Sequence, residues 1–236
     1  MKFGKKPAKR LRKALPLSNY LHMGQVAYPA VHAWERPIAY GMLGNDAVGD
    51  CTIAGRYHIR MNMQAVANAG TLLIVTDQQA LADYSAITGY NPADPSTDQG
   101  ANMTDVLAWY KDKYVTLDVQ NVEQVKAAIY IFGADYIGFG VPQSMADQLN
   151  NGIDPDWAFV ANDKPSGEGH CVAPFGYGRD GLALCSWGKI YRTSWDFWLQ
   201  NVDEAYALVL PDWIKRSGTS PSGLDLNGLI ADLAQV

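Results

Sequence analysis

The sequence predicts an α+β fold in which a helical half precedes a half built of antiparallel strands. Apolar residues recur at helical spacing over residues 51–133, whereas short alternating segments bounded by glycines follow from residue 134 onward. A helix-rich run followed by a strand-rich run is typical of this class. At 236 residues with 48% hydrophobic content, the chain is long enough to build one large domain or two small lobes around a full core.

Four helices are expected in the first half, because apolar residues repeat there every three to four positions. Asp50 is the expected N-cap of the first helix, and Thr76 with Gln79 forms a capping box at the start of the second. Gly70 and Gly89 can end these two helices, since glycine favours helix ends. The four helices are expected over residues 51–70, 76–89, 103–114 and 121–133.

Three strands are expected in the second half, over residues 136–141, 170–178 and 182–187. Arg179-Asp180-Gly181 joins the last two, and its Asp-Gly pair suits a tight hairpin turn. A turn near Tyr177-Gly178 would place His170 opposite Cys185, whereas a plain Asp-Gly turn would place His170 opposite Tyr191. Both registers fit the pattern, because a shift in pairing leaves the alternation of each strand unchanged.

Positive charge is concentrated at the start of the chain. Seven of the 19 Lys and Arg residues fall within the first 13 positions, and no acidic residue precedes Glu35. We interpret residues 1–32 as a basic arm that is either solvated or docked on an acidic partner, such as nucleic acid or a neighbouring subunit. The rest divides into a helical lobe (33–120), a strand-rich lobe (121–215) and a tail (216–236). The tail begins as a Ser/Gly/Pro linker and ends in a short amphipathic piece that can pack back or contact a partner.

Several protein classes are not indicated. No apolar run approaches the roughly 20 residues of a membrane span, so no membrane-spanning helix is expected. Three cysteines provide no disulfide framework and fit a reducing compartment, which favours the cytoplasm or an assembly built inside a cell, such as a virion. The sequence has no Gly-x-x-x-x-Gly-Lys-Ser/Thr loop, so nucleotide hydrolysis is not proposed, and no cofactor is expected.

Cys51 and His170 are the candidate reactive residues. A thiol in the first turn of a helix lies close to unpaired backbone N–H groups, which favour the thiolate. His170 starts a predicted strand after glycines that permit close approach. A lone cysteine is often only a small buried apolar residue, but a cysteine at a helix start and a histidine at a strand start can form a thiolate–imidazolium pair.

The segments around Cys51 and His170 resemble motifs of the papain-like cysteine peptidases, and the resemblance extends over residues 33–210. The family reads Gln-Gly-x-Cys-Gly-Ser-Cys-Trp around its nucleophile, which is similar to residues 45–52 here, with the nucleophile at Cys51 and a glycine at Gly49. The resemblance implies that Asn45 donates its side-chain amide to the oxyanion, in the place of the family's glutamine. It implies a two-lobe fold with an N-terminal helical lobe and a C-terminal antiparallel sheet or barrel lobe. The segments TDQQALADY, VEQVKAAIYIFGADYIGFGV and GHCVAPFGYG resemble further family motifs in the right order.

The segment Cys185-Ser186-Trp187-Gly188 resembles the family's Asn-Ser-Trp-Gly, which implies supporting roles at the catalytic His170. Cys185 stands where the family has an asparagine that orients the histidine, and Trp187 stands where a tryptophan shields that contact from water. Two other departures are informative. Residues 98–102 match the family's Cys-x-Gly-Gly segment only loosely, and the basic arm does not resemble an inhibitory prodomain.

Three hypotheses follow. The first is a cysteine hydrolase, most simply a peptidase acting on peptides or proteins, in which Cys51 attacks a carbonyl, His170 protonates the leaving group, and Asn45 with the Cys51 N–H holds the oxyanion. The second is a catalytically degenerate papain-fold protein that serves a structural or binding role, for example in a phage particle, through its basic arm and tail. The third is a metal or redox site of Cys51, His170 and Cys185. Because the cysteine spacing lacks a Cys-x-x-Cys element, we expect no metal.

Overall fold

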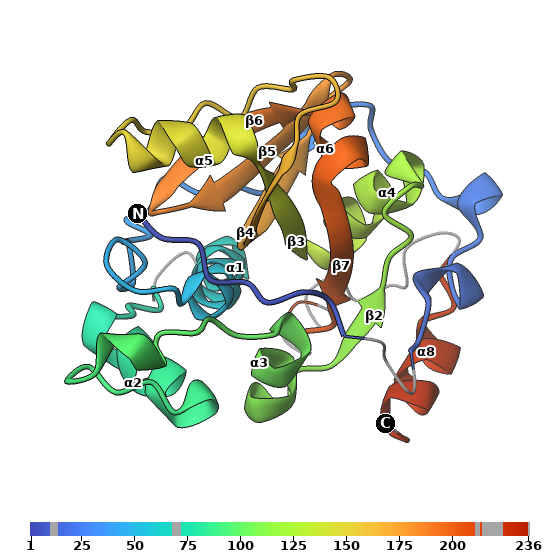
Figure 1. Ribbon diagram of the computed structural model, residues 1–236. Helices are drawn as coiled ribbons and strands as arrows, with labels where there is room; N and C mark the ends of the chain where they lie inside the picture. The colour runs from blue at the N-terminus through green and yellow to red at the C-terminus, as the bar shows by residue number, and fades with distance from the viewer. Residues whose placement is uncertain (10–13, 68–71, 211–212, 214–223, 236) are drawn as a thin grey trace.

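The computed structural model describes residues 1–9, 14–67, 72–210, 213 and 224–235 (Figure 1). An antiparallel sheet lies at its centre, with the strands in the order β2-β7-β3-β4-β5-β6 and with β1 paired to β4. The fold is α+β, which confirms the predicted class. The strands are β1 (His32–Ala33), β2 (Tyr114–Thr116), β3 (Asp135–Pro142), β4 (Pro165–Tyr177), β5 (Gly181–Ser186), β6 (Lys189–Ser194) and β7 (Val202–Leu208).

Helices cover both faces of this sheet. Helix α1 packs against β4 on one face, and α2 and α3 lie beyond it, while α4 and α6 lie on the other side of the strands (Figure 1). The described helices are α1 (Cys51–Ala67), α2 (Asp77–Thr88), α3 (Met103–Tyr110), α4 (Val122–Phe132), α5 (Gln143–Asn150), α6 (Trp195–Asn201) and α8 (Leu226–Leu233), with short 3-10 turns at Leu17–Asn19, Met23–Gln25 and Pro95–Thr97.

Two of the expected helices have the ends that their capping residues predict. The Thr76 hydroxyl accepts a hydrogen bond from the Gln79 amide at 3.2 Å, and Gly89 ends α2 in the left-handed conformation. Asn121 caps α4 in the same way, and Gly133 ends it with φ 88°. Helix α1 begins at Cys51 as expected, and its expected stop at Gly70 lies outside the described residues.

The third helix is shorter than expected. It ends at Tyr110 instead of residue 114, because Lys111 adopts the left-handed conformation (φ 56°) and Tyr114 starts β2, which pairs with β7. The apolar periodicity continues through this segment, but strand pairing with a distant part of the chain determines its structure. Helices α5 and α6 and strands β6 and β7 were not among the expected elements.

The register between β4 and β5 matches neither expected alternative. Ala173 lies opposite Cys185, and a bulge between Pro174 and Gly176 shifts the pairing before the turn at residues 178–180. His170 pairs instead with Phe139 of β3, on the other side of β4. The bulge adds a residue to β4 and so changes which side chains of β5 can approach the histidine.

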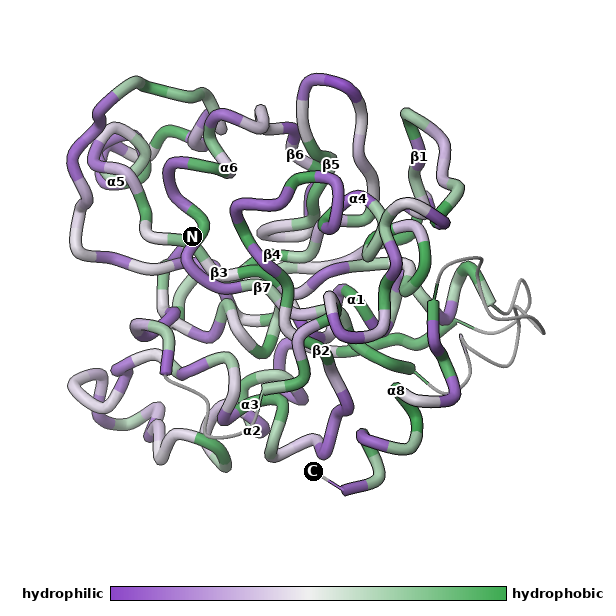
Figure 2. The backbone as a smooth tube through the Cα atoms, turned by 90° about the vertical axis from the view of Figure 1, so that its right-hand side faces the viewer, coloured by the Kyte–Doolittle hydropathy of each residue, from purple (hydrophilic) through white to green (hydrophobic). Residues whose placement is uncertain are grey.

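Both terminal segments pack onto the body of the protein. Leu17 is fully buried, and Pro16 forms a bridge with Thr116 of β2. In Figure 2, α8 alternates between hydrophobic and hydrophilic residues, and its buried side chains Leu229 and Leu233 belong to the main apolar core. The amphipathic piece of the tail therefore packs back, and the Tyr20 hydroxyl donates to Asp232. None of the helices among the described residues is long and apolar enough to cross a bilayer.

Candidate active site

Cys51 is the first residue of α1, and its thiol is buried against the sheet. Its side chain is 1% exposed and lies in an apolar cluster with Tyr136 and Cys171. The Tyr136 hydroxyl donates to the Thr52 carbonyl at 2.7 Å, which ties the first turn of the helix to β3. Burial raises the pKa of the Cys51 thiol to about 12, while the backbone N–H groups of Cys171 and Gly4 act in the opposite direction. In this conformation the thiol is therefore protonated at neutral pH.

His170 is held rigidly within β4. Its Nε2 lies 2.8 Å from the Ser186 hydroxyl, and the Trp187 ring stacks on the imidazole with centroids 4.5 Å apart. Nδ1 has no hydrogen-bond partner among the described residues. Burial, with a smaller contribution from His58, lowers the pKa of His170 to about 3, so the imidazole is neutral.

Cys51 lies against the strand that carries the histidine. The sulfur of Cys51 faces the backbone N–H of Cys171, the residue that follows His170 in β4. Helix α1 and strand β4 pack against each other along this contact. The start of α1 therefore lies beside the strand that carries His170, and both side chains are uncharged in this state. That the two side chains form a catalytic pair stays a prediction.

Ser186 makes the contact with His170 that sequence reasoning would assign to position 185. Cys185 is completely buried and faces the apolar cluster between α1 and the sheet, with Tyr40 and Phe175. Successive side chains of a strand point to opposite faces, so Cys185 and Ser186 cannot both approach the histidine. The bulge in β4 gives that position to Ser186. In the sequence, Cys185 follows apolar residues and Ser186 is polar, a signal that could have identified Ser186 as the residue that faces His170.

Asn45 and Gly49 lie in the turn that leads into α1. The Asn45 amide donates to the Val48 carbonyl at 2.9 Å, so one of its two protons is used within its own loop. The Gly49 amide donates to the Asp98 carboxylate at 3.0 Å. These two bonds hold the loop directly before Cys51.

Asp50 does not cap α1 as expected. Its carbonyl accepts the first helical hydrogen bonds from Ile53 and Ala54, but its buried carboxyl oxygens have no hydrogen-bond partner among the described residues. Burial raises the pKa of Asp50 to about 8, although the nearby side-chain amide of Asn45 acts in the opposite direction. The side chain is therefore a neutral acid at pH 7 beside the candidate nucleophile.

The raised pKa of Asp50 predicts a specific dependence of stability on pH. The folded chain keeps a proton that the unfolded chain loses above about pH 4, so this group lowers the free energy of unfolding as pH rises towards 8. We expect Asp50→Asn to gain stability relative to the wild type by about 1 kcal/mol per pH unit between pH 5 and 7. Urea unfolding at both pH values measures this, with the exposed neighbour Asp46→Asn as the control. A difference that does not change with pH would contradict the prediction.

The first six residues of the chain cross this site, which the sequence did not suggest. In Figure 1 the dark-blue N-terminal segment passes in front of α1, between the helices and the sheet. The amides of Gly4 and Lys5 donate to the Gly169 carbonyl at 3.1 and 2.9 Å. The Ala101 amide donates to the Gly4 carbonyl at 2.9 Å, and Lys6 donates back to Ala101. Residues 1–6 are therefore held between Gly169, the residue before His170, and Ala101, with which Lys5 forms an isolated parallel bridge.

Aromatic contacts complete the cover over the site. The ring of Phe3 lies 5.4 Å from the His170 ring and 5.9 Å from Trp187, measured between centroids. The Trp187 indole N–H donates to the Lys2 carbonyl at 3.4 Å. The segment therefore contributes to the burial of the imidazole and the thiol, which is the first cause of both pKa shifts.

Glycines allow the segment to lie this close. A Cβ on Gly4 would lie 1.9 Å from the Gly49 carbonyl oxygen, and a Cβ on Gly169 would lie 2.4 Å from the Lys5 carbonyl oxygen. Gly100 adopts φ 69°, and its Cβ would lie 2.0 Å from the Gly4 oxygen. These are backbone contacts, which leave no room for a side chain. The segment and the body therefore fit each other only because both have glycine at these points.

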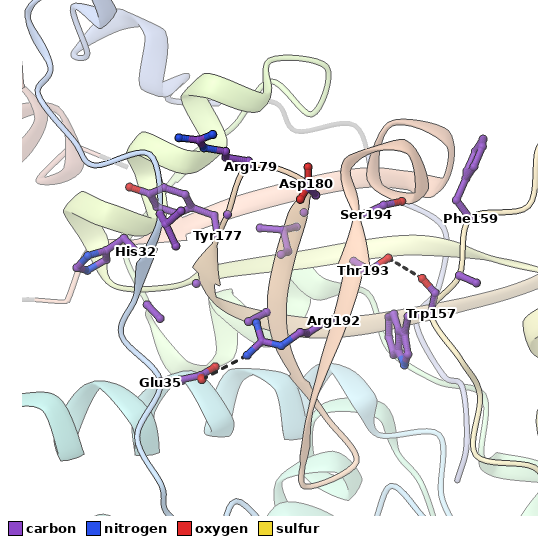
Figure 3. A pocket seen from close by; sticks show the side chains of 18 of the residues that line it. His32, Glu35, Trp157, Phe159, Tyr177, Arg179, Asp180, Arg192, Thr193 and Ser194 are labelled. Carbon is purple, nitrogen blue, oxygen red and sulfur yellow. Dashed lines mark hydrogen bonds and ion pairs between the residues drawn. The ribbon is translucent and has the colours of Figure 1, made fainter.

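A different cavity lies away from these residues. It has a volume of about 940 Å³ and is lined by β1, the ends of β4 and β6, and residues 156–159 (Figure 3). Arg192 approaches Glu35 there at 4.0 Å, and the Thr193 hydroxyl donates to the Trp157 carbonyl. None of the site residues expected from the sequence lines it. Within the described part of the chain, no three His, Cys, Asp or Glu side chains are grouped so that they could hold a metal ion.

Comparisons with known proteins concern the fold. No protein-family model matches the chain, and no curated protein matches its sequence. The structure is similar to that of xylellain, a cysteine protease from Xylella fastidiosa, with a TM-score of 0.60 and 15% identity over 87% of this chain and 95% of that one. The Carica candamarcensis cysteine protease CMS1MS2 matches with a TM-score of 0.45 and 14% identity over 77% of this chain and 99% of that one. Procathepsin L 3 of Tenebrio molitor matches with a TM-score of 0.44 and 12% identity over 87% of this chain and 74% of that one.

Proposed function

We propose, on the premise that this chain has the fold of the papain-like cysteine proteases, that it is a cysteine hydrolase, most simply a peptidase acting on peptides or proteins. One observation carries the proposal. Cys51 begins a helix and directs its sulfur at the backbone beside His170, whose ring Ser186 and Trp187 hold in place. A thiol at a helix start, packed against the strand that carries an oriented imidazole, supplies two of the groups that nucleophilic catalysis requires.

In the proposed reaction, His170 takes the proton of the Cys51 thiol, and the resulting thiolate attacks the carbonyl carbon of the substrate as the electron pair of the C=O bond moves to oxygen. The Cys51 N–H and the amide of Asn45 stabilise this oxyanion, for which the amide has to turn away from Val48 and Asp50. His170 gives its proton to the leaving amine as the C–N bond breaks, which leaves a thioester on Cys51. His170 then removes a proton from water, which attacks the thioester and releases the acid and the thiol.

The N-terminal segment has to leave the site before this reaction can begin. While residues 1–6 cover it, the pKa of Cys51 is about 12 and that of His170 is about 3, so a proton transfer between them is unfavourable. Water that enters after the segment leaves would reverse both shifts, because burial is the first cause of each. We therefore propose that the covered form is a resting state and the uncovered form is the hydrolase.

Replacing Ser186 with alanine is expected to lower kcat by about tenfold to a hundredfold and to leave KM nearly unchanged. The hydroxyl touches His170 at 2.8 Å and no reacting atom, so its loss would let the imidazole turn away from the productive geometry. The pH profile of kcat/KM should also move, because a hydrogen bond to the imidazole affects its pKa. These quantities are measured by steady-state hydrolysis of a fluorogenic peptide between pH 5 and 9.

The adjacent Cys185→Ala variant is the matched control. Its side chain is equally buried in β5 but faces the opposite side, towards Tyr40 and Phe175. We expect this variant to lose thermal stability while it keeps its kcat. If both variants lose kcat equally with no change in the pH profile, Ser186 has no specific role in orienting His170.

A further inference from the structure

Lys5 of the N-terminal segment occupies a buried acidic pocket. Its ammonium lies 2.9 Å from Asp203 and 3.0 Å from Glu204, and its side chain is only 1% exposed. Glu204 is 6% exposed and Asp203 is 43% exposed, so the pocket has one buried and one accessible carboxylate. Burial acts to lower the pKa of Lys5, but the charges of Glu204 and Asp203 outweigh it and raise the pKa above 10.5. The lysine is therefore charged where it is buried.

The walls of the pocket fit an unbranched basic side chain. A Cβ on Gly138 would lie 2.0 Å from Cε of Lys5 and 2.6 Å from the sulfur of Met103, so the stem passes over a glycine and beside a flexible apolar residue. The Tyr206 hydroxyl donates to the second oxygen of Glu204 at 2.7 Å. This bond orients the carboxylate and leaves the other oxygen, Oε1, to the ammonium.

Glu204 depends on a cation in this pocket. Apart from its ion pair with Lys5, Oε1 is a buried atom with no hydrogen bond from any described residue. A buried carboxylate that loses its partner is strongly destabilised unless another cation or water replaces it. When the segment leaves, the pocket will favour whichever ligand brings a positive charge back.

The backbone that carries Lys5 into the pocket also contacts the candidate active site. The amide of Lys5 donates to the carbonyl of Gly169, which precedes His170, and the adjacent Gly4 lies against Gly49, close to Cys51. A peptide that replaces the segment along the same backbone acceptors would direct one side chain into the space that Lys5 leaves. Extending the proposed hydrolase function, we propose that Asp203 and Glu204 form a subsite for a lysine or arginine side chain of the substrate, for which Lys5 is the intramolecular occupant.

Peptide binding to the full-length chain with Gly4→Ala and Cys51→Ala tests this proposal. The first change opposes docking of the segment, and the second prevents hydrolysis. The probes are blocked hexapeptide amides of alanine in which one position at a time is lysine, its neutral isostere norleucine, or glutamate. Dissociation constants are measured by titration calorimetry. We expect lysine to bind at least about thirtyfold more tightly than norleucine at one position, because norleucine leaves Glu204 without a cation.

Adding Glu204→Gln should reduce this preference to about threefold or less, whereas Asp203→Asn, at the more exposed carboxylate, should reduce it less. Thermal unfolding establishes that each variant is folded. Equal binding of the lysine and norleucine peptides, no binding of any peptide, or a preference that survives Glu204→Gln would overturn the subsite.

The same peptides separate this proposal from the hydrolase on which it rests. The Gly4→Ala chain with Cys51 intact is incubated with each peptide, and cleavage is followed by mass spectrometry. Selective binding of the lysine peptide without its cleavage would retain the subsite and reject the peptidase function. Cleavage that shows no preference for the lysine peptide would retain the peptidase and overturn the subsite.

Discussion

Replacing Cys51 with alanine is expected to lower peptide hydrolysis by at least about 10⁴-fold, because the proposed reaction has no other nucleophile and the members of such a pair act as a unit. The substitution removes one buried sulfur atom and keeps the helix start, so the fold should persist. Hydrolysis is measured in the wild-type chain and with Gly4→Ala, in which the site is expected to be uncovered. Circular dichroism and thermal unfolding report on the fold.

The other two cysteines provide the controls. Cys171 and Cys185 are free and buried like Cys51, but neither begins a helix. Alanine at either position should cost stability through the cavity that it leaves and should not abolish turnover. His170→Ala should match Cys51→Ala. Turnover that is unchanged in Cys51→Ala would reject the hydrolase, and the absence of any activity in both parent chains would favour the catalytically degenerate hypothesis.

The elements that could be predicted from the sequence are those whose ends depend on nearby residues. Thr76 and Gln79 are three positions apart, and Asn121 and Gly133 bracket a single amphipathic helix, so local chemistry determined both helices. The end of α3 could not be predicted in this way, because Tyr114 pairs with Leu208 at the far end of the chain. Pairing at that separation leaves no signal in an eleven-residue window.

The residues of the candidate site differ in the same way, because some are indicated by local motifs and others depend on contacts between distant parts of the chain. Cys51 and His170 could be chosen as candidates because each lies in a short motif. The contact of His170 with Ser186 and not Cys185 depends on a bulge between Pro174 and Gly176, which only the packed sheet reveals. The position of the N-terminal segment depends on partners far along the chain, such as Gly169 and Glu204. A basic N-terminal arm on an acidic protein predicts that the arm is attracted to the body of the protein. It does not predict which carboxylates the arm contacts.

Replacing Gly4 with alanine is expected to uncover Cys51 and to raise its rate of alkylation by iodoacetamide. The new Cβ would lie 1.9 Å from the Gly49 carbonyl oxygen, and backbone on both sides prevents a small adjustment. If the pKa of Cys51 falls from about 12 towards the ordinary value of 9, the thiolate fraction at pH 8 rises by up to about 10³-fold. The rate is measured by mass spectrometry, with the matched Cys51→Ala chain as the background for Cys171 and Cys185.

Gly24→Ala is the control, because a Cβ there would meet nothing within 4 Å. Its alkylation rate should equal that of the wild type. The pH profile gives an independent test, since the thiolate is the reacting form. In the wild type the rate should keep rising to about pH 12, whereas in Gly4→Ala it should level off at lower pH, at the pKa of an accessible thiol. If both chains react slowly with the same profile, burial by α1 and the sheet keeps the thiol neutral, and residues 1–6 do not control the site.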